Sequence, residues 1–260
     1  MEQELEQVYE QREETNTKDQ VNQPVENDDK MTKMENVEDK LVKSSFSITY
    51  AFLVTTGTIT FIEALRTKSD TMRHILNLET CISIVAAYFY GKFMEDIETS
   101  VESNEELLEQ DYKTLNVTRY LDWSITTPIM LLVLILAFRY NLGQKGISFL
   151  SFVVILLLNF GMLASGYVGE QGLLPRFQAN FIGFLFFGGM FGYIYYKYLH
   201  KKKNKVNEML FAAFFILWSL YGVFYQMEER LRNVGYNVLD LFSKCFVGIY
   251  FWSLSSGIFV

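Results

Sequence analysis

The chain alternates between long apolar stretches and short polar segments, and this alternation predicts its fold. Each apolar stretch is long enough to cross the roughly 30 Å hydrocarbon core of a bilayer as a helix. The stretches cover residues 45–66, 71–94, 115–139, 146–168, 175–199, 207–227 and 235–258. We therefore predict an all-α membrane protein, built as a seven-transmembrane helix bundle.

The charged residues of the connections predict how this bundle is oriented. The second connection is strongly acidic and the sixth is mixed. Basic side chains gather in the first, third and fifth connections, at Arg66, Lys68, Arg73, Arg139, Lys145, Lys197, Lys201, Lys202, Lys203 and Lys205. Because loops rich in Lys and Arg stay in the cytoplasm, we predict that the N-terminus lies outside and the C-terminus inside.

Residues 1–43 differ in composition from the rest of the chain. They are mostly Glu, Gln, Asp, Asn and Lys, and such a segment cannot bury enough apolar surface to offset its ordering entropy. We predict a disordered acidic extracellular tail over 1–43 and one seven-helix domain over 44–260. The only basic run, 200–205, is too short to indicate nucleic-acid binding. Cys81 and Cys245 lie in apolar stretches and predict neither a disulfide framework nor a metal site.

Three charged residues lie inside the apolar stretches. Lys244 is in the middle of the last stretch, and Asp240 is one turn earlier on the same helix face. Asp122 lies inside the third stretch at a similar depth. Isolated charges in a bilayer would be neutralised, whereas a paired cluster can stay ionised and marks a functional site. We predict that the lysine and the two carboxylates meet; a buried salt bridge that merely joins two helices is the alternative.

The residues around Asp122 carry a resemblance to a known family. The run Arg-Tyr-Leu-Asp-Trp-Ser-Ile-Thr-Thr-Pro over 119–128 closely resembles the third helix of bacteriorhodopsin and the proteorhodopsins. Together with Lys244, it is typical of microbial (type 1) rhodopsins. The resemblance implies that Lys244 holds all-trans retinal as a protonated Schiff base. Asp122 would then be the primary counterion and proton acceptor, and Asp240 the second counterion.

Further residues match positions around the retinal in that family. Arg119 would balance the two negative charges from the extracellular side, and Thr126 would hydrogen-bond Asp122. Tyr90 and Tyr221 match tyrosines that point at the second counterion. The other pocket positions are Trp123, Met130, Met162, Gly166, Trp218 and Tyr225. Gly222 departs from the family pattern, since a proline is usual there, and Tyr225 stands where a tryptophan is common, which leaves the shape of the ring end open.

A family motif bears on transport and reads Asp122, Thr126 and Val133 here. It argues against the chloride and sodium pumps of the family. Outward proton pumps often carry an acid at the third position as the internal proton donor, which Val133 cannot be. Glu79 lies at a similar depth, roughly 10 Å in at 1.5 Å per residue, where an apolar setting makes a carboxyl hold its proton more tightly. We predict Glu79 as the donor. The alternatives are a neutral Glu79 bonded to a nearby Ser or Thr, or Glu63 as donor, although Glu63 is better interpreted as a snorkelling surface acid.

A donor on the second helix resembles the rhodopsins of giant marine viruses, some of which resemble pumps and others cation channels. We predict a light-driven outward proton pump, not an enzyme, whose proton leaves through Glu228 and Glu229. The alternatives are a light-gated cation channel, a photosensor, or a transporter without a chromophore. Ala86 stands where a channel often has a second acid, which favours the pump. Asn237 adds a polar group near Asp240 and Gly222 could loosen the sixth stretch, so the channel stays an alternative hypothesis. Expected partners are membrane lipids, protons and further copies of the chain, as a trimer or pentamer in a host membrane if the source is viral.

Overall fold

The computed structural model describes residues 40–104, 109–144 and 146–258 of the 260-residue chain. The chain divides into two units, Met1–Leu41 and Val42–Val260. The tail predicted over 1–43 lies almost entirely outside the described residues, so its disorder stays a prediction. The bundle of the second unit holds all the predicted site residues.

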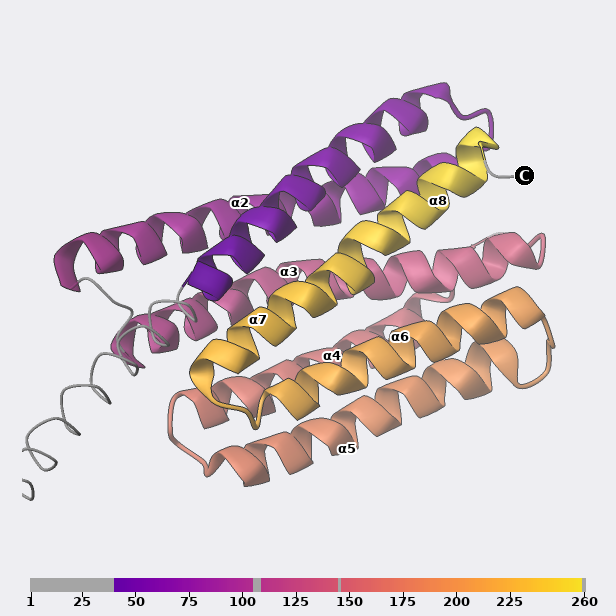
Figure 1. Ribbon diagram of the computed structural model, residues 1–260. Helices are drawn as coiled ribbons and strands as arrows, with labels where there is room; N and C mark the ends of the chain where they lie inside the picture. The colour runs from indigo at the N-terminus through magenta and orange to yellow at the C-terminus, as the bar shows by residue number, and fades with distance from the viewer. Residues whose placement is uncertain (1–39, 105–108, 145, 259–260) are drawn as a thin grey trace, which may run out of the picture. The chain divides into compact units, whose positions relative to one another are not determined.

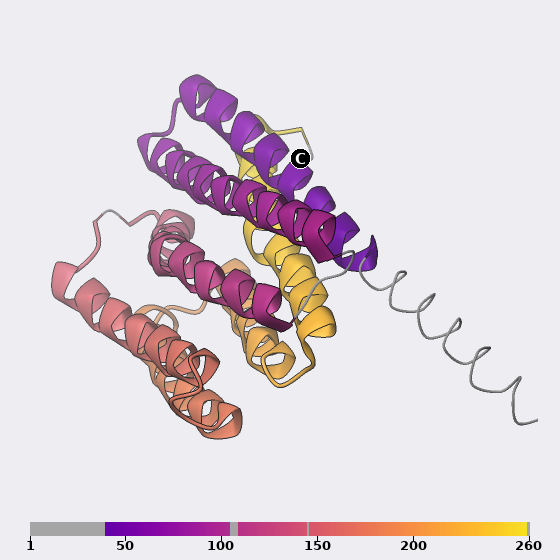
Figure 2. The same cartoon turned by 90° about the vertical axis from the view of Figure 1, so that its left-hand side faces the viewer.

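The described residues of the bundle are helical, and the helices lie alongside one another (Figures 1 and 2). In chain order they are Lys40–Arg66 (indigo in Figure 1), α2 (Asp70–Asn104), α3 (Glu109–Asn141), α4 (Phe149–Glu170), α5 (Arg176–Ile194), α6 (Lys205–Phe224), α7 (Glu229–Asp240) and α8 (Phe246–Ser256). The π-helical turn η1 (Tyr195–Leu199) continues α5, and η2 (Leu241–Cys245) joins α7 to α8. A continuous helical segment is called a rod here, so α5–η1 is one rod and α7–η2–α8 is another. Counted in this way, the described residues form seven helices, as predicted.

Six of these helices are long and apolar enough to cross a membrane. They are Lys40–Arg66, Tyr112–Asn141, Phe149–Glu170, Arg176–Leu199, Lys205–Phe224 and Glu229–Ser256. The seventh, α2, is not in this set, and polar residues such as His74, Asn77 and Glu79 lie along it. Of these three side chains Glu79 is buried inside the bundle, as a polar group within a bilayer requires, whereas His74 and Asn77 are exposed in the first turns of the helix.

Short connections make consecutive helices neighbours. From α2 to α7 each helix packs on the next, and two further contacts join distant parts of the chain: α2 packs on α8, and α3 packs on α6. The rod α7–η2–α8 therefore lies against α2 as well as α6. The helix α3 also packs on both α2 and α6. These contacts bring the charged residues of α3 and of the last rod into the interior.

Two buried apolar clusters fill most of the bundle. One includes Leu76, Leu134 and Phe191, and the other includes Phe46 and Phe93. Both consist of apolar side chains that bury well in a helical bundle. The buried charged residues belong to neither cluster, and four of them, Arg119, Asp122, Asp240 and Lys244, gather between α3, α7 and η2.

Candidate functional site

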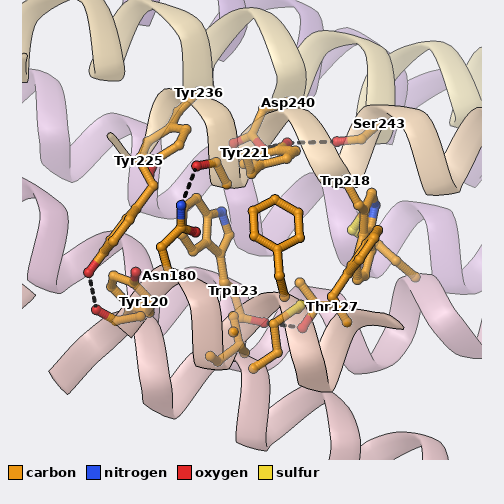
Figure 3. A pocket seen from close by; sticks show the side chains of 18 of the residues that line it. Tyr120, Trp123, Thr127, Asn180, Trp218, Tyr221, Tyr225, Tyr236, Asp240 and Ser243 are labelled. Atoms are coloured by element: carbon orange, nitrogen blue, oxygen red, sulfur yellow. Dashed lines mark hydrogen bonds between the residues drawn. The ribbon is translucent and has the colours of Figure 1, made fainter. Parts of the chain in front are cut away.

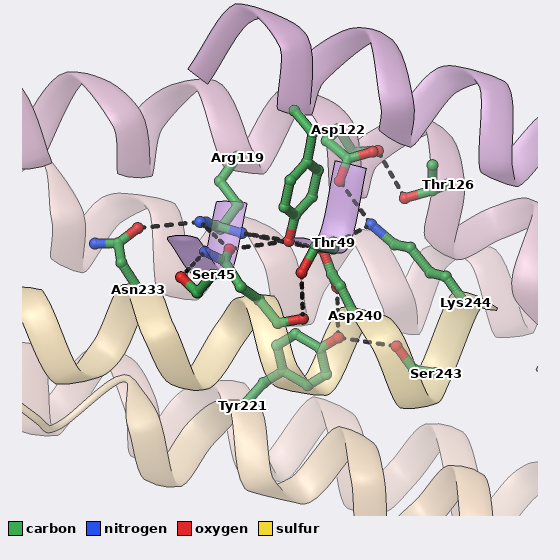
Figure 4. A network of polar contacts seen from close by, with 12 residues as sticks. Ser45, Thr49, Arg119, Asp122, Thr126, Tyr221, Asn233, Asp240, Ser243 and Lys244 are labelled. Atoms are coloured by element: carbon green, nitrogen blue, oxygen red, sulfur yellow. Dashed lines mark hydrogen bonds and ion pairs between the residues drawn. The ribbon is translucent and has the colours of Figure 1, made fainter. Parts of the chain in front are cut away.

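Lys244 is buried in the π-helical turn η2, only 1% exposed. Its Nζ donates to Asp122 Oδ2 at 2.7 Å and to Asp240 Oδ2 at 3.1 Å (Figure 4). Both carboxylates are fully buried. A π turn inside a helix frequently marks a functional site, and this one places the lysine between a carboxylate of α3 and one of α7. A buried charge is tolerated only when it is paired in this way.

The two carboxylates differ in how firmly they are held. Asp240 accepts hydrogen bonds from Tyr90 Oη at 2.8 Å and from Tyr221 Oη at 2.6 Å. Asp122 Oδ1 has no hydrogen-bond partner among the described residues. The Thr126 hydroxyl donates to the backbone carbonyl of Asp122 at 2.9 Å and not to its carboxylate, because it folds back on its own helix. The expected bond between Thr126 and Asp122 is thus a backbone bond. Asp122 therefore has an oxygen free to take a proton.

Arg119 lies one turn before Asp122 on α3 and is 1% exposed. Its Nη1 is 4.0 Å from Asp240 Oδ2. Its Nη2 donates to the side-chain oxygens of Asn233 and Asn237, both at 3.0 Å. Figure 4 shows the guanidinium beside the carboxylate cluster, with Asn233 on its far side. Two amides of α7 thus hold this cation in place, and the sequence offered no pattern that predicted them in this role.

A cavity with about 750 Å³ of space, part of it open to solvent, leads from Lys244 into the bundle. The lining is mostly apolar and aromatic, and Lys244 is the one lysine among the described residues that form it. Figure 3 shows how aromatic side chains of α3, α6 and α7 surround the space. The predicted pocket residues that line it are Trp123, Met130, Met162, Gly166, Trp218, Tyr221 and Tyr225. Tyr90 does not line the cavity and instead contacts the carboxylate cluster.

The far end of the cavity has a defined shape. A Cβ at Gly166 would collide with the Tyr120 hydroxyl, and one at Gly222 would lie 2.5 Å from Phe184. The Tyr225 hydroxyl donates to the Gly166 carbonyl at 2.8 Å. Gly222, which departs from the pattern of the family that the sequence resembles, therefore accommodates the Phe184 ring. The cavity is a mostly apolar slot that is lined by Lys244 and Asp240, and Asp122 contacts the Lys244 nitrogen beside it.

Glu79 lies on α2 and is 1% exposed. Its Oε2 has no hydrogen-bond partner among the described residues, and a Cβ added to Gly248 would lie 3.3 Å from it. The carboxyl therefore faces α8 in a buried setting. Glu63 was expected to be a surface acid, and that expectation is wrong: its residue is 4% exposed and its Oε1 accepts a hydrogen bond from Ser255 at 2.9 Å. The helix-end position of Glu63 suggested exposure, but α8 covers it.

A second charged cluster lies at the start of α7. Arg232 is fully buried; it pairs with Glu170 at 2.7 Å and also with Glu229. Glu229 accepts from Asn116 at 2.8 Å and from Arg176 at 3.1 Å. Glu228, the other acid predicted to release protons, caps α7 by accepting from the Leu231 amide.

The roles of Glu170 and Arg232 in this cluster were missed from the sequence. Glu170 is the last residue of α4 and Arg232 is in the first turn of α7. Charges at helix ends are common, and nothing in their spacing indicated that these two form a buried pair. The pair joins the end of α4 to the start of α7, two helices that are not consecutive in the chain.

Residues 41–257 match the family described as bacteriorhodopsin-like protein. The chain belongs to this family. The green-light absorbing proteorhodopsin of Gamma-proteobacterium EBAC31A08 is 28% identical over 160 residues, which are 54% of this chain and 61% of that protein. The blue-light absorbing proteorhodopsin of Gamma-proteobacterium Hot 75m4 is 25% identical over 163 residues, 55% of this chain and 62% of that one. The match thus spans about three fifths of these curated relatives.

Solved structures show the same relationship. The viral rhodopsin OLPVRII is 55% identical, with a TM-score of 0.77 over 85% of this chain and 100% of that one. Xanthorhodopsin is 18% identical, with a TM-score of 0.67 over 85% of this chain and 94% of that one, and shows the shared fold. The prediction of a microbial rhodopsin similar to viral rhodopsins is confirmed. This rhodopsin is a multi-pass integral membrane protein.

Rhodopsins of this family bind retinal through a Schiff base to a lysine, and the cavity of this rhodopsin fits that cofactor. The slot is mostly apolar, as a polyene requires, and among the residues that the structure describes Lys244 is the one lysine that lines it. The carboxylates of Asp122 and Asp240 flank the lysine nitrogen, where a positive charge needs compensation. Trp123 and Trp218 both line the slot, so two large flat side chains are available to contact the cofactor.

Proposed function

We propose that this rhodopsin is a light-driven outward proton pump in which Lys244 carries retinal, Asp122 accepts the proton and Glu79 returns one. The observation that carries the proposal is the asymmetry of the two carboxylates at Lys244. Retinal, bound as a protonated Schiff base, supplies light absorption and a light-driven change of shape. All other steps are assigned to side chains of the chain.

Asp122 is the acceptor because it is close to the lysine nitrogen and is not otherwise occupied. Its Oδ2 is 2.7 Å from Lys244 Nζ, whereas its Oδ1 makes no hydrogen bond to the described residues. Both carboxylate oxygens of Asp240 already accept hydrogen bonds from tyrosine hydroxyls. The proton therefore moves from the Lys244 nitrogen to Asp122, and Asp240 serves as the second counterion.

Arg119 and the polar groups beyond it form the exit side. The two amides that hold Arg119 belong to Asn233 and Asn237, and Asn233 also donates to Asn116 at 3.4 Å. Asn116 in turn donates to Glu229. When Asp122 takes up the proton, the cluster loses one negative charge. It then attracts the Arg119 guanidinium less strongly, and Arg119 moves away from it. Glu229 lies at the end of this chain of side chains and is the release group that the geometry favours, whereas Glu228 is engaged as a helix cap.

Glu79 supplies the returning proton from the other side. Burial without a partner for Oε2 favours the protonated carboxyl, which is the state that a donor needs. The third position of the transport motif, Val133, is fully buried in an apolar cluster and has no proton to give. In the predicted orientation α2 begins at the cytoplasm, so Glu79 returns a proton to the Lys244 nitrogen from the cytoplasmic side. The net movement of protons is therefore outward.

A light-gated cation channel is the second candidate, and one observation favours it. A row of buried polar side chains runs along the first helix and α2, formed by Thr49, Thr56, Thr60, Glu63, Glu79, Thr80 and Ser83. A channel needs a continuous polar lining of this kind. We favour the pump because the hydroxyls of Thr60 and Thr80 are hydrogen-bonded to each other at 2.9 Å. This bond joins the first helix to α2 and interrupts the polar path between them. The predicted trimer or pentamer, and the host membrane, stay predictions.

The direct test is the light-induced pH change of a suspension of cells that express the protein with added retinal. A pump acidifies the medium, and a protonophore abolishes the change because it dissipates the proton gradient. Voltage-clamp photocurrents separate the candidates further. A pump current keeps its sign over a wide voltage range, whereas a channel current reverses. A coloured protein that gives neither signal would exclude both candidates and leave the photosensor.

A further inference from the structure

A second cavity lies at the end of the bundle where α3 and η1 end and α4 begins. It has about 410 Å³ of space between its atoms, part of it open to solvent, and is separate from the slot that ends at Lys244. Arg139, Lys197 and Lys202 line it, together with Ser148, Gln144 and Tyr198. None of the described residues that line it is acidic. The cavity thus combines three cations with neutral hydrogen-bonding groups.

Tyr198 is the feature that distinguishes this cavity from an ordinary basic surface. The residue is 8% exposed, and its hydroxyl is buried without a hydrogen-bond partner among the described residues. Burial of a hydroxyl without a partner is unfavourable. Tyr198 and Lys197 are both in the π-helical turn η1, where the His200 amide donates to the Tyr195 carbonyl. Such turns are often found at functional sites.

The remaining groups suit a tetrahedral anion. Lys197 and Lys202 are exposed side chains that can move toward a ligand, and Arg139 is half-buried at the end of α3. Ser148 is the N-cap of α4, a helix of 22 residues, and the positive end of a long helix favours a negative group. Guanidinium and ammonium groups form their strongest hydrogen bonds with carboxylate and phosphate oxygens.

We propose that this cavity binds a phosphate group. The predicted orientation places it on the cytoplasmic side, where anionic phospholipids gather and where basic pockets between helices bind their headgroups. A phosphate oxygen would accept a hydrogen bond from the Tyr198 hydroxyl, and the three cations would neutralise the negative charge of the phosphate. The same chemistry fits a lipid headgroup and free phosphate. The site does not depend on whether the protein pumps protons.

The test measures binding through thermal bleaching of the full-length, retinal-loaded protein. The protein is placed in phosphatidylcholine nanodiscs, and inorganic phosphate is titrated against sodium chloride of equal ionic strength, which controls for screening. A parallel series replaces part of the phosphatidylcholine with phosphatidic acid. A ligand that binds the folded protein raises the bleaching temperature. A rise with both probes identifies the phosphate group itself, and a rise with phosphatidic acid alone identifies the lipid headgroup. If the bleaching temperature rises with neither probe, the proposal is wrong.

Matched variants locate the binding. Tyr198→Phe removes the single buried hydroxyl and should weaken binding about tenfold or more, as expected for a hydrogen bond to a charged group. The double variant Lys197→Gln/Lys202→Gln should abolish the response. Tyr196→Phe and Lys201→Gln alter exposed neighbours that do not line the cavity and should leave binding unchanged. If Lys201→Gln weakens binding as much as the double variant, or if Tyr198→Phe has no effect, the response is general attraction to a basic surface and the proposal is wrong.

Discussion

Lys244 Nζ is closer to Asp122 than to Asp240, at 2.7 Å and 3.1 Å, although Asp240 is its neighbour on the same rod. Asp240 is held by two tyrosines and Asp122 by none. The lysine therefore has one firmly fixed and one more loosely held counterion. This difference distinguishes an acceptor from a permanent charge and leads to the first prediction.

Asp122→Asn should shift the visible absorption to longer wavelength. Loss of the nearer negative charge destabilises the positive charge in the ground state more than in the excited state, so the energy gap narrows. Absorption spectra of purified protein measure the effect, with Asp240→Asn as the comparison. No shift in Asp122→Asn, together with a large shift in Asp240→Asn, would mean that Asp240 is the principal counterion.

Lys244→Ala should give a protein without visible colour when retinal is added. Within the described part of the chain, Lys244 is the one lysine that lines the slot, so no other described amine is placed to bind the cofactor. Lys92→Ala, which changes an exposed lysine away from the slot, should keep full colour. Because the substitution removes a cation from beside two buried carboxylates, expression and monodispersity are checked by gel filtration. A folded, coloured Lys244→Ala protein would refute the assignment.

Glu79→Gln should keep the colour and slow the return of a proton to the Lys244 nitrogen by roughly 10²-fold, the usual contribution of a positioned acid. Flash photolysis at the wavelengths of the deprotonated state gives the rate directly. A small soluble weak acid should restore part of the rate, since it replaces the missing carboxyl. Glu63→Gln is the control, because Glu63 is also buried but is bonded to Ser255. An unchanged decay in Glu79→Gln would leave the protein without an internal donor.

The sequence predicted the parts of this protein that follow from periodicity and from spacing within one helix. Seven apolar stretches gave seven helices, and the four-residue spacing of Asp240 and Lys244 placed them on one face. It did not predict contacts between residues far apart in the chain. The amides of Asn233 and Asn237 reach Arg119 only because α7 packs beside α3. The burial of Glu63 likewise depends on α8, which no local pattern of the first helix records.

Glu170 and Arg232 give the last prediction, since their contact also joins distant helices. Arg232→Gln should strongly lower the temperature at which the visible colour is lost, because it leaves a buried carboxylate without its cation. Removal of one partner of a buried pair costs about 3–5 kcal/mol. The double variant Glu170→Gln/Arg232→Gln should recover part of that loss, since no buried charge of this pair is left unpaired.

The matched control is Arg73→Gln, which breaks a 3.1 Å pair with Asp70 whose side chains are 43% and 86% exposed. Exposed pairs contribute about 0–1 kcal/mol, so this variant should bleach at nearly the same temperature as the parent protein. If Arg232→Gln behaves like Arg73→Gln, the cluster at the start of α7 does not stabilise the bundle. In that case its carboxylates are better explained by proton release alone, and Glu229→Gln should then delay the appearance of protons in the medium while leaving the bleaching temperature unchanged.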